Sequence, residues 1–471
     1  MRFTQRFWAH RWSKTEPMSS RPWLLLPIET KHREFYGKIL LSLAAAERGF
    51  EVLLGEQNAM LSQLDNLPQG IYLDKSVGRT KTKYFKRLDA RGSRIVAWCE
   101  EGLVYRDRDA YLHERVSNAS LALANRFFAW GDVQANDIHK QAPEADAKVR
   151  ITGNPRFDML RPEFRSVFTP AADKIRQCYG PYILINSNFS RYNHFMGYDF
   201  WIEALKQRGT ITNDEQLAFY YRWRDFLGKV FHGFIRVMPA LSSAFPDRML
   251  LVRPHPSEDH ATWFRETAAL NNVTVVHEDS AIPWIAGADA VIHNSCTTGL
   301  EAYLLGIPVA AFRPAVDETF DSYLPNAVSH EAVDGEGLIE TLRELLAGTA
   351  TPPPSAQSEV NRYVAALDGS LAADRVADAL IEISLRCELQ KMGPIRRARI
   401  ARENTVSALK PMLRRIRRSH KATSYAKQKF PGIELSEVEH AINQLRDASG
   451  RFAGITSTRS PFRHCFRICK T

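Results

Sequence analysis

One segment in the second half of the chain restricts the possible folds more than any other. Residues 288–292 and 307–310 predict two short buried strands, and residues 299–305 predict a helix between them. The polar turn His-Asn-Ser-Cys-Thr-Thr at 293–298 joins the first strand to the helix. A strand, a helix and a strand at this spacing form a unit whose two strands are parallel. The segment therefore predicts an α/β protein with a parallel sheet.

The polar turn also has the chemistry of an anion site. Free backbone N–H groups and the positive end of the helix dipole meet where a helix follows a strand. The turn adds polar side chains at Asn294, Ser295, Thr297 and Thr298, and Glu301 in the first helical turn is placed to accept from a sugar hydroxyl. The alternative interpretation is a simple helix cap, since most such turns bind no ligand.

A second segment, about forty residues earlier, predicts a buried strand that ends in Arg253-Pro254-His255-Pro256. The two prolines stiffen the backbone past the strand and hold Arg253 and His255 at the carboxyl edge of the sheet. A guanidinium and an imidazole at that edge suit a phosphate group. The alternative is that Arg253 pairs with a nearby carboxylate and His255 caps a turn.

Together the two segments resemble the C-terminal half of two-Rossmann (GT-B) glycosyltransferases. The nearest resemblance is to the bacterial surface-carbohydrate group, which includes capsule and lipopolysaccharide Kdo transferases and is related to sialyltransferases. Members of this group carry a His-Pro motif that contacts the phosphate of a CMP-sugar, followed by a Ser/Thr-rich motif. They also carry an acidic-acidic-Gly motif in the N-terminal half, which Glu100-Glu101-Gly102 matches. The resemblance covers roughly residues 22–390.

The resemblance implies a glycosyltransferase that needs no metal ion and no cofactor besides its nucleotide-sugar substrate, with CMP-Kdo or a similar CMP-linked sugar as the donor. A surface polysaccharide or lipopolysaccharide is the implied glycan or glycolipid acceptor. The residues expected to bind the donor are Arg253, His255, Pro256, Asn294, Ser295, Thr297, Thr298, Glu301, Ser187 and Asn188. For Ser187 and Asn188, which follow the predicted strand 182–186, capping of a turn is an equal alternative.

Glycosyl transfer needs a carboxylate, as the base for the acceptor hydroxyl or as a nucleophile if configuration is retained. The candidates are Glu29, Glu100 and Glu101, which each follow a predicted strand of the first domain, and the resemblance favours Glu101. The alternative for each is a surface carboxylate or a helix cap. Lys31 and Arg33 are candidates for contact with an anionic acceptor or with the donor's carboxylate.

The length of 471 residues predicts two to three domains. We expect two Rossmann-like domains that face each other across a cleft, followed by a basic helical tail. The expected parts are an N-terminal extension (1–20), an acceptor domain (21–165), a nucleotide-sugar domain with a crossing helix (166–390) and the tail (391–471). A long helical stretch at 216–241 carries an aromatic stripe, which we interpret as core rather than as a stacking site.

Charge is unevenly distributed along the chain. Residues 391–471 hold 19 Lys and Arg against 5 Asp and Glu, which gives the tail a net charge of +14. Because the whole chain has a net charge of +10, the first 390 residues carry −4. Residues 395–416 alternate basic clusters with apolar residues at helical spacing, which favours a helix lying on an anionic membrane surface. The alternative is a helix packed on the body. The tail matches no nucleic-acid-binding fold, so no nucleic acid partner is expected.

No apolar run reaches the length of a membrane span and no signal peptide precedes the first domain, so we expect a cytoplasmic protein at the inner face of the membrane. The six cysteines are scattered and show no zinc-binding spacing, so no metal site is expected. Two other classes stay open: a sugar-nucleotide epimerase or hydrolase of the same build, and a non-catalytic scaffold in polysaccharide assembly.

Overall fold

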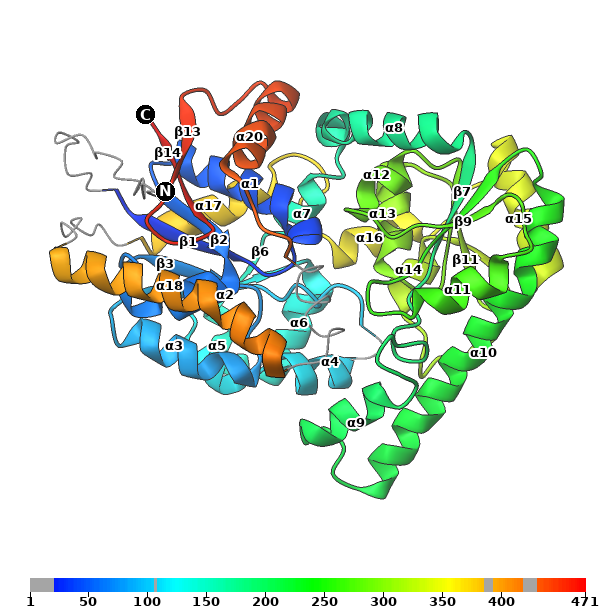
Figure 1. Cartoon of the computed structure of the whole chain (residues 1–471), viewed down its shortest axis with the longest axis horizontal. Helices are drawn as coiled ribbons and strands as arrows, with labels where there is room; N and C mark the ends of the chain where they lie inside the picture. The colour runs from blue at the N-terminus through cyan, green and yellow to red at the C-terminus, as the bar shows by residue number, and fades with distance from the viewer. Residues whose placement is uncertain (1–20, 106–107, 385–392, 418–429) are drawn as a thin grey trace, which may run out of the picture.

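A computed structural model describes residues 21–105, 108–384, 393–417 and 430–471 of the chain. The expected extension at 1–20 lies outside these residues. Two lobes, each built on its own sheet, lie side by side (Figure 1). This is the α/β architecture with two Rossmann-like domains that the sequence predicts.

The first lobe holds an eight-stranded sheet in the order β13-β14-β2-β1-β3-β4-β5-β6. Strands β1 to β6 are parallel, and all six residues of β1 are buried because helices cover both faces of the sheet. The bounds are β1 (Trp23–Ile28), β2 (Glu51–Glu56), β3 (Ile71–Asp74), β4 (Arg94–Ala97), β5 (Arg126–Ala129), β6 (Val149–Ile151), β13 (Ile455–Arg459) and β14 (Cys465–Lys470).

The second lobe holds a six-stranded parallel sheet in the order β12-β11-β10-β7-β8-β9. This is the Rossmann order, in which the chain leaves the first strand in one direction and later returns to add strands on its other side. The point of reversal lies between β7 and β10. The bounds are β7 (Tyr182–Asn186), β8 (Met249–Arg253), β9 (Val273–Val275), β10 (Ala290–His293), β11 (Val309–Phe312) and β12 (His330–Ala332).

Helices alternate with the strands in both lobes. Those of the first lobe and its exit are α1 (Lys31–Glu47), α2 (Gln57–Ser62), α3 (Thr82–Asp89), α4 (Arg108–Arg115), α5 (Asn118–Leu123), α6 (Asp132–Gln141) and α7 (Pro155–Asp158). Those that follow are α8 (Thr169–Tyr179), α9 (Phe200–Gln207), α10 (Asp214–Ala244), α11 (His260–Thr267), α12 (Ala281–Ala286), α13 (Thr297–Leu305), α14 (Tyr323–Ala327), α15 (Gly335–Ala347), α16 (Ala356–Tyr363), α17 (Ala372–Glu382), α18 (Pro394–Arg417) and α20 (Leu435–Ser449).

Helix α10 is the longest helix of the described chain and projects with α9 away from the second sheet (Figure 1). Asn213 starts it by accepting the backbone N–H of Gln216 at 2.9 Å, which satisfies one of the free donors at the helix end. Its aromatic stripe packs into the core of the second lobe, as expected, although two of its rings also reach the interlobe cavity described below.

The chain returns to the first lobe through α17, which packs against α1. The expected crossing helix is interrupted, because residues 364–371 separate α16 from α17. The buried carboxylate of Asp158 starts α17 by accepting the N–H groups of Ala372 and Ala373, both at 2.8 Å. Burial raises the pKa of this carboxyl to about 7.

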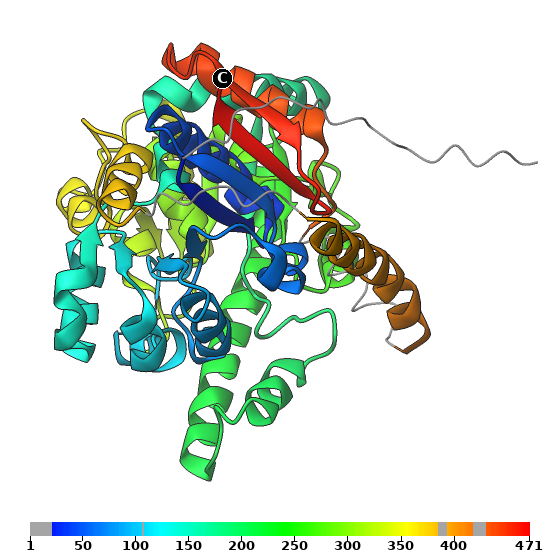
Figure 2. The same ribbon diagram turned by 90° about the vertical axis from the view of Figure 1, so that its left-hand side faces the viewer.

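The tail at 391–471 is only partly helical, which differs from the expectation. Its last described strands, β13 and β14, form a hairpin, and β14 pairs antiparallel with β2 at the edge of the first sheet (Figure 2). The guanidinium of Arg467 donates to both carboxylate oxygens of the buried Glu51 at 2.9 and 3.0 Å. Apolar side chains of β14 alternate into the core and so fix its register. Helix α20 packs against α1 beside the hairpin.

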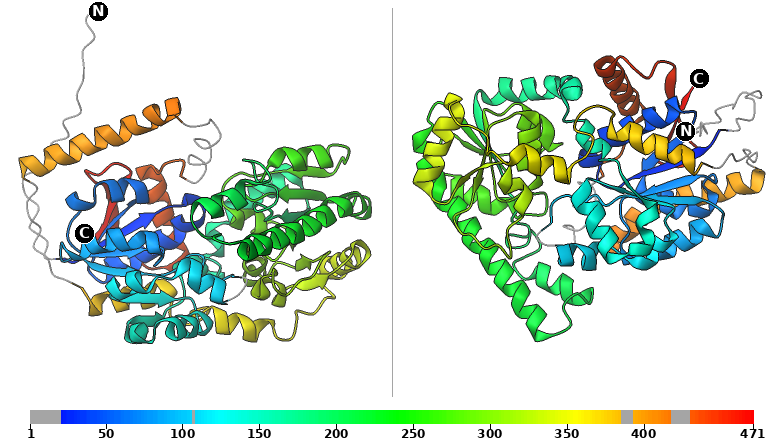
Figure 3. Two further views of the ribbon diagram at one scale, coloured as in Figure 1. Left: turned by 90° about the horizontal axis from the view of Figure 1, so that it is seen from below. Right: turned by 180° about the vertical axis from the view of Figure 1, so that it is seen from behind.

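Helix α18 lies along the outside of the first lobe (Figures 1 and 3). Ile400, expected on its apolar face, is buried against the first lobe, and Arg396 donates to the carbonyls of Asn66 and Leu67. The expected apolar residues after Val406 lie outside the described side chains. In the part of the chain that the structure describes, every helix is too short or too polar to cross a bilayer.

The hairpin should contribute to the stability of the first lobe. Ile468 is fully buried on β14, so Ile468→Ala should lower the free energy of unfolding by about 2–5 kcal/mol. Chemical denaturation monitored by circular dichroism measures the change, and Thr456→Ala at an exposed position of β13 is the matched control. A loss within about 0.5 kcal/mol of the control would show that the hairpin is not docked.

Candidate active site

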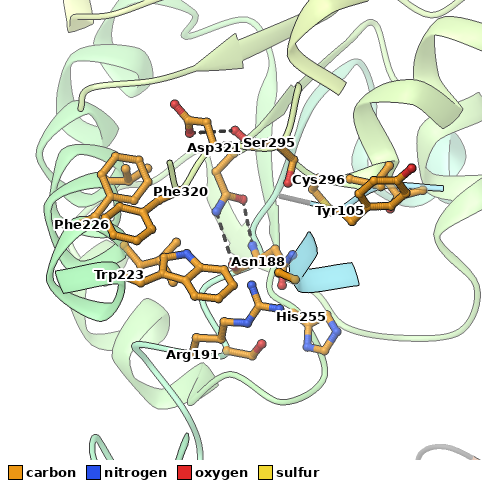
Figure 4. Close-up of a pocket in the computed structure, with 18 of the residues that line it drawn as sticks. Tyr105, Asn188, Arg191, Trp223, Phe226, His255, Ser295, Cys296, Phe320 and Asp321 are labelled. Atoms are coloured by element: carbon orange, nitrogen blue, oxygen red, sulfur yellow. Dashed lines mark hydrogen bonds between the residues drawn. The ribbon is translucent and has the colours of Figure 1, made fainter. Parts of the chain in front are cut away.

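A cavity of about 290 Å³ lies between the two lobes (Figure 4). The first lobe contributes Glu101 and the segment around α4, and the second lobe contributes loops at the carboxyl ends of its central strands. Those loops follow β7, β8 and β10, beside the point where the strand order reverses, which is where open α/β sheets bind ligands. The segment after β11 also lines the cavity. The predicted residues that line it are Glu101, Asn188, His255, Asn294, Ser295 and Thr297.

A buried carboxylate organises this edge of the second sheet. Oε1 of Glu258 accepts the hydroxyl of Ser187 at 2.9 Å and the backbone N–H groups of Phe189 at 2.9 Å and His255 at 3.0 Å. Its Oε2 accepts the indole N–H of Trp263 at 3.0 Å. Burial raises the pKa of Glu258, while these four donors oppose that shift. The carboxylate thus joins the loop after β7 to the loop after β8.

The same network decides the role of Ser187, which was expected to bind the donor. Its hydroxyl is buried and donates to Glu258, so it does not line the cavity. Sequence reasoning missed Glu258, although it stands two residues after the Arg-Pro-His-Pro segment.

His255 lies in the cavity as a neutral imidazole. Its Nδ1 accepts the backbone N–H of Ser257 at 3.1 Å, which leaves the ring proton on Nε2. Burial lowers the pKa of His255 to about 4, with Glu101 opposing that shift across the cleft and Arg33 adding to it. A neutral imidazole with its proton on Nε2 is a hydrogen-bond donor for a phosphate oxygen. Pro256 faces solvent and does not line the cavity.

The polar turn after β10 is held by its own side chains. Asn294 accepts the N–H of Asn188 at 2.9 Å through its side-chain oxygen and so joins two loops. Ser295 has φ +54° and its hydroxyl donates to Asp321 at 3.3 Å while it accepts from Asn326 at 3.0 Å. The Ser295 hydroxyl therefore joins the turn to the segment after β11, and the turn places Thr297 and the start of α13 at the cavity.

Three other expected donor residues do not line the cavity. Arg253 donates to the carbonyls of Glu278 at 3.3 Å and Asp279 at 2.7 Å, and burial lowers its pKa to about 10. Glu301 is almost fully buried and forms an ion pair with Arg156 of α7, so it is not placed to accept from a sugar. The hydroxyl of Thr298 is buried beside Cys296 and does not line the cavity. Arg253, Glu301 and Thr298 therefore lie behind the residues that line the cavity.

In the first lobe, Glu101 pairs with Arg33 at 2.9 Å, and 44% of its side chain is open to the cleft. The Arg33 guanidinium, with smaller contributions from other cations, lowers the pKa of Glu101 to about 2. Its carboxylate is therefore ionised across the neutral pH range, opposite His255. Arg33 is itself behind this carboxylate and does not line the cavity.

The other acidic and basic candidates of the first lobe bond to partners outside the cavity. Glu100 is buried and accepts the indole N–H of Trp98 at 2.8 Å, and burial, followed by the charge of Glu34, raises its pKa. Glu29 pairs with Lys75. Lys31 pairs with Glu437 of α20 at 2.6 Å, so it supports the packing of the tail.

Sequence reasoning missed several residues of the cavity. The guanidinium of Arg191 lies 4.2 Å from the centre of the Trp223 ring, between that ring and His255 in Figure 4. Arg191 lies four residues after Ser187 in the loop that follows β7. Its position beside the predicted residues Ser187 and Asn188 was the available signal. The aromatic and polar wall consists of Tyr105, Tyr111, Trp223, Phe226, Phe320 and Asp321, and nothing in their sequence spacing joins the residues near 105, 223 and 320.

Among the described residues, no group of three or more His, Cys, Asp or Glu has a metal-binding arrangement. The cationic side chains that line the cavity are Arg115, Arg191 and Arg313, and the backbone N–H groups at the start of α13 add partial positive charge.

Comparison with known proteins identifies the fold. No protein family model and no curated protein sequence matches the chain. Among solved structures, the H548A variant of the wall teichoic acid polymerase TagF has a TM-score of 0.50 and 9% identity, over 78% of this chain and 89% of that chain. The UDP-GlcNAc 2-epimerases of Methanocaldococcus jannaschii (TM-score 0.48, 10% identity, 77% and 99% covered) and Neisseria meningitidis (0.46, 14%, 77% and 99%) are also similar. At such identities the likeness concerns the fold alone, and the fold is GT-B.

The geometry predicts the titration of His255. Its pKa should lie near 4, and Glu101→Gln should lower it further because the substitution removes a negative charge that stabilises the imidazolium. NMR titration of the imidazole resonances measures both values, and Glu340→Gln on the outer helix α15 is the control that should leave the pKa unchanged. A His255 pKa near 6.5, or a His255 pKa that Glu101→Gln leaves unchanged, would show that the two side chains do not lie close together across the cavity.

The Glu258 network predicts a cost for a neutral replacement. Glu258→Gln replaces one carboxylate oxygen, an acceptor, by an NH2 group, which is a donor. That NH2 group would face a buried N–H or O–H donor, so the free energy of unfolding should fall by about 1–3 kcal/mol. Denaturant titration measures the loss, and Glu318→Gln at an exposed position serves as the control. Equal stability of the two variants would mean that the network does not hold these loops.

Proposed function

We propose that this chain is a metal-independent glycosyltransferase that takes its sugar from a nucleotide-activated donor. The observation that carries the proposal is the placement of the ionised Glu101 of the first lobe opposite His255 and the start of α13 in the second lobe, in one cavity. A phosphate leaving group needs donors and positive charge on one side, and the anomeric carbon needs a carboxylate on the other.

The second lobe supplies the groups for the phosphate. The proton on Nε2 of His255, the guanidinium of Arg191 and the N–H groups at the start of α13 are the donors of this wall. As the bond from the anomeric carbon to the phosphate oxygen breaks, the electron pair leaves with the phosphate. These donors stabilise the charge that develops there without the need for a metal ion.

Glu101 has a different task. A pKa of about 2 makes it a weak base in the ground state, since an efficient general base has a pKa near the working pH. We assign it the stabilisation of positive charge on the sugar and the orientation of the acceptor hydroxyl. It accepts the hydroxyl proton only as the new bond to the anomeric carbon forms and the hydroxyl becomes strongly acidic. Arg33 keeps the carboxylate ionised and positioned.

The finer parts of the proposal come from the sequence resemblance. They are a CMP-linked, Kdo-like donor and a surface polysaccharide or lipopolysaccharide acceptor. The basic tail adds a proposed position at the inner face of the cytoplasmic membrane. The exposed face of α18, with Arg397, Arg399 and Arg402, is the surface we propose for anionic lipid, because Ile400 on the opposite face packs on the body.

The proposal predicts nucleotide binding. A thermal-shift panel of CMP, UDP, GDP and their sugars should show stabilisation by CMP and CMP-sugars. His255→Ala or Arg191→Ala should weaken binding about 10- to 100-fold, as the loss of one hydrogen bond to a charged group requires. His440→Ala on α20, far from the cavity, is the control.

The panel also discriminates the alternatives. Stabilisation by UDP alone removes the CMP assignment and leaves the glycosyltransferase proposal standing. Turnover of a donor in the absence of any acceptor would identify an epimerase or hydrolase. A chain that binds no nucleotide would be the scaffold, and the proposed function would fall.

A further inference from the structure

A second hollow, of about 510 Å³, lies on the outer side of α10 next to the interlobe cavity. Helix α10 separates the two, because its inner side carries Trp223, Phe226 and Val230 into the interlobe cavity. We call the outer hollow the α10 groove. It is lined by Tyr192, Tyr198, Asp225, Gly228, Lys229, His232, Arg236, Pro314 and Ala315.

Two glycines of α10 let the walls of the groove approach the helix. A Cβ on Gly228 would lie 2.6 Å from the Tyr192 ring, and a Cβ on Gly233 would lie 2.3 Å from Pro314. Glycine inside a helix costs about 0.5–1 kcal/mol relative to alanine. The close packing of a tyrosine and a proline against these two positions shows that the groove is built into the helix sequence.

The groove carries positive charge that the described protein does not neutralise. Lys229 and Arg236 lie seven residues apart, on one face of α10, and both are exposed. Within the described residues, neither forms an ion pair with a carboxylate. The one acid of the groove is Asp225, which lies 3.7 Å from the guanidinium of Arg224. His232 accepts or donates one hydrogen bond, at 2.9 Å, with the hydroxyl of Tyr192.

The groove also offers aromatic faces. Tyr192 and Tyr198 meet edge to face, with ring centres 5.4 Å apart and an interplanar angle of 85°. Tyr198 is 46% exposed, and the guanidinium of Arg224 lies 4.0 Å from its ring centre. Aromatic faces bordered by cations and hydroxyl groups suit a ligand that combines apolar ring surfaces with negative charge.

The α10 groove adjoins the proposed active site at one residue. Ala315 lines both hollows, and Arg191 of the cavity precedes Tyr192 of the groove in the chain. A chain-like ligand that places its reactive end in the cavity can therefore extend past Ala315 into the groove.

We propose that the α10 groove binds the acceptor, an oligosaccharide whose units carry carboxylate or phosphodiester groups. The inference rests on the proposed function, since it names the substrate class of the same enzyme. The anionic groups pair with Lys229 and Arg236, and sugar rings pack on Tyr192 and Tyr198. The acceptor thus contacts the second lobe as well as the first, and Lys31, expected to bind it, is committed to the tail.

The test is a binding titration of the full chain with three probes of about ten units each: oligogalacturonate, which carries carboxylates, poly(glycerol phosphate), which carries phosphodiesters, and neutral dextran. At least one anionic probe should bind, and added salt should weaken that binding. Lys229→Ala with Arg236→Ala should weaken it about tenfold, and the better of the two anionic probes identifies the acidic group.

The matched control is Lys174→Ala with Arg94→Ala, which removes two exposed cations outside the groove and should leave the affinity unchanged. CMP binding is measured on the same samples and should be unaltered in both double variants. Binding of dextran as tight as that of the anionic probes, binding of neither anionic probe, or an equal effect of the two double variants would overturn the groove assignment. If the unaltered chain does not bind nucleotides, that result would instead overturn the proposed function.

Discussion

The buried carboxylate of Glu258 is the interaction on which the geometry of the cavity depends. The loops after β7, β8 and β10 meet at the carboxyl edge of the second sheet, and hydrogen bonds between their side chains and backbones hold them together. Glu258 gives two of them a shared acceptor, so that the backbones of Phe189 and His255 donate to the same oxygen. Asn294 joins the third loop by its bond to Asn188. The imidazole of His255 and the side chain of Arg191 are thereby set in place before a ligand arrives, which is the preorganisation that electrostatic catalysis requires.

An ionised carboxylate and a neutral imidazole face each other across the interlobe cavity. Arg33 holds Glu101 ionised in the first lobe, while burial keeps His255 neutral in the second. The asymmetry separates the two kinds of work in glycosyl transfer: one wall tolerates positive charge on the sugar, and the other donates hydrogen bonds to the phosphate. A reaction that moves charge from one bond to the next fits between two such walls.

The sequence predicted the strands that carry the motifs, the two-lobed GT-B build and the edge at which the cavity lies, because buried parallel strands and polar turns have strong local signatures. It placed His255, Thr297 and Glu101 at the cavity on the same grounds. Arg253, Glu301 and Ser187, which were expected to bind the donor, lie beside the motifs but do not line the cavity, because their side chains contact buried partners. Trp223 and Phe320 were missed because only the tertiary fold brings them to the cavity, whereas Arg191 was missed although it lies in the loop of a predicted motif. The hairpin β13–β14 was missed because its partner strand is remote in the sequence.

That remoteness has a consequence for how the protein is made. Glu51 of β2 and Arg467 of β14 are paired although 416 positions separate them. While a ribosome extends the chain, β2 is an open edge of the growing sheet for almost the whole of translation. An open edge is a template for pairing with another chain. The first lobe is therefore most exposed to misassembly when it is newly synthesised, and the arrival of the hairpin ends that period.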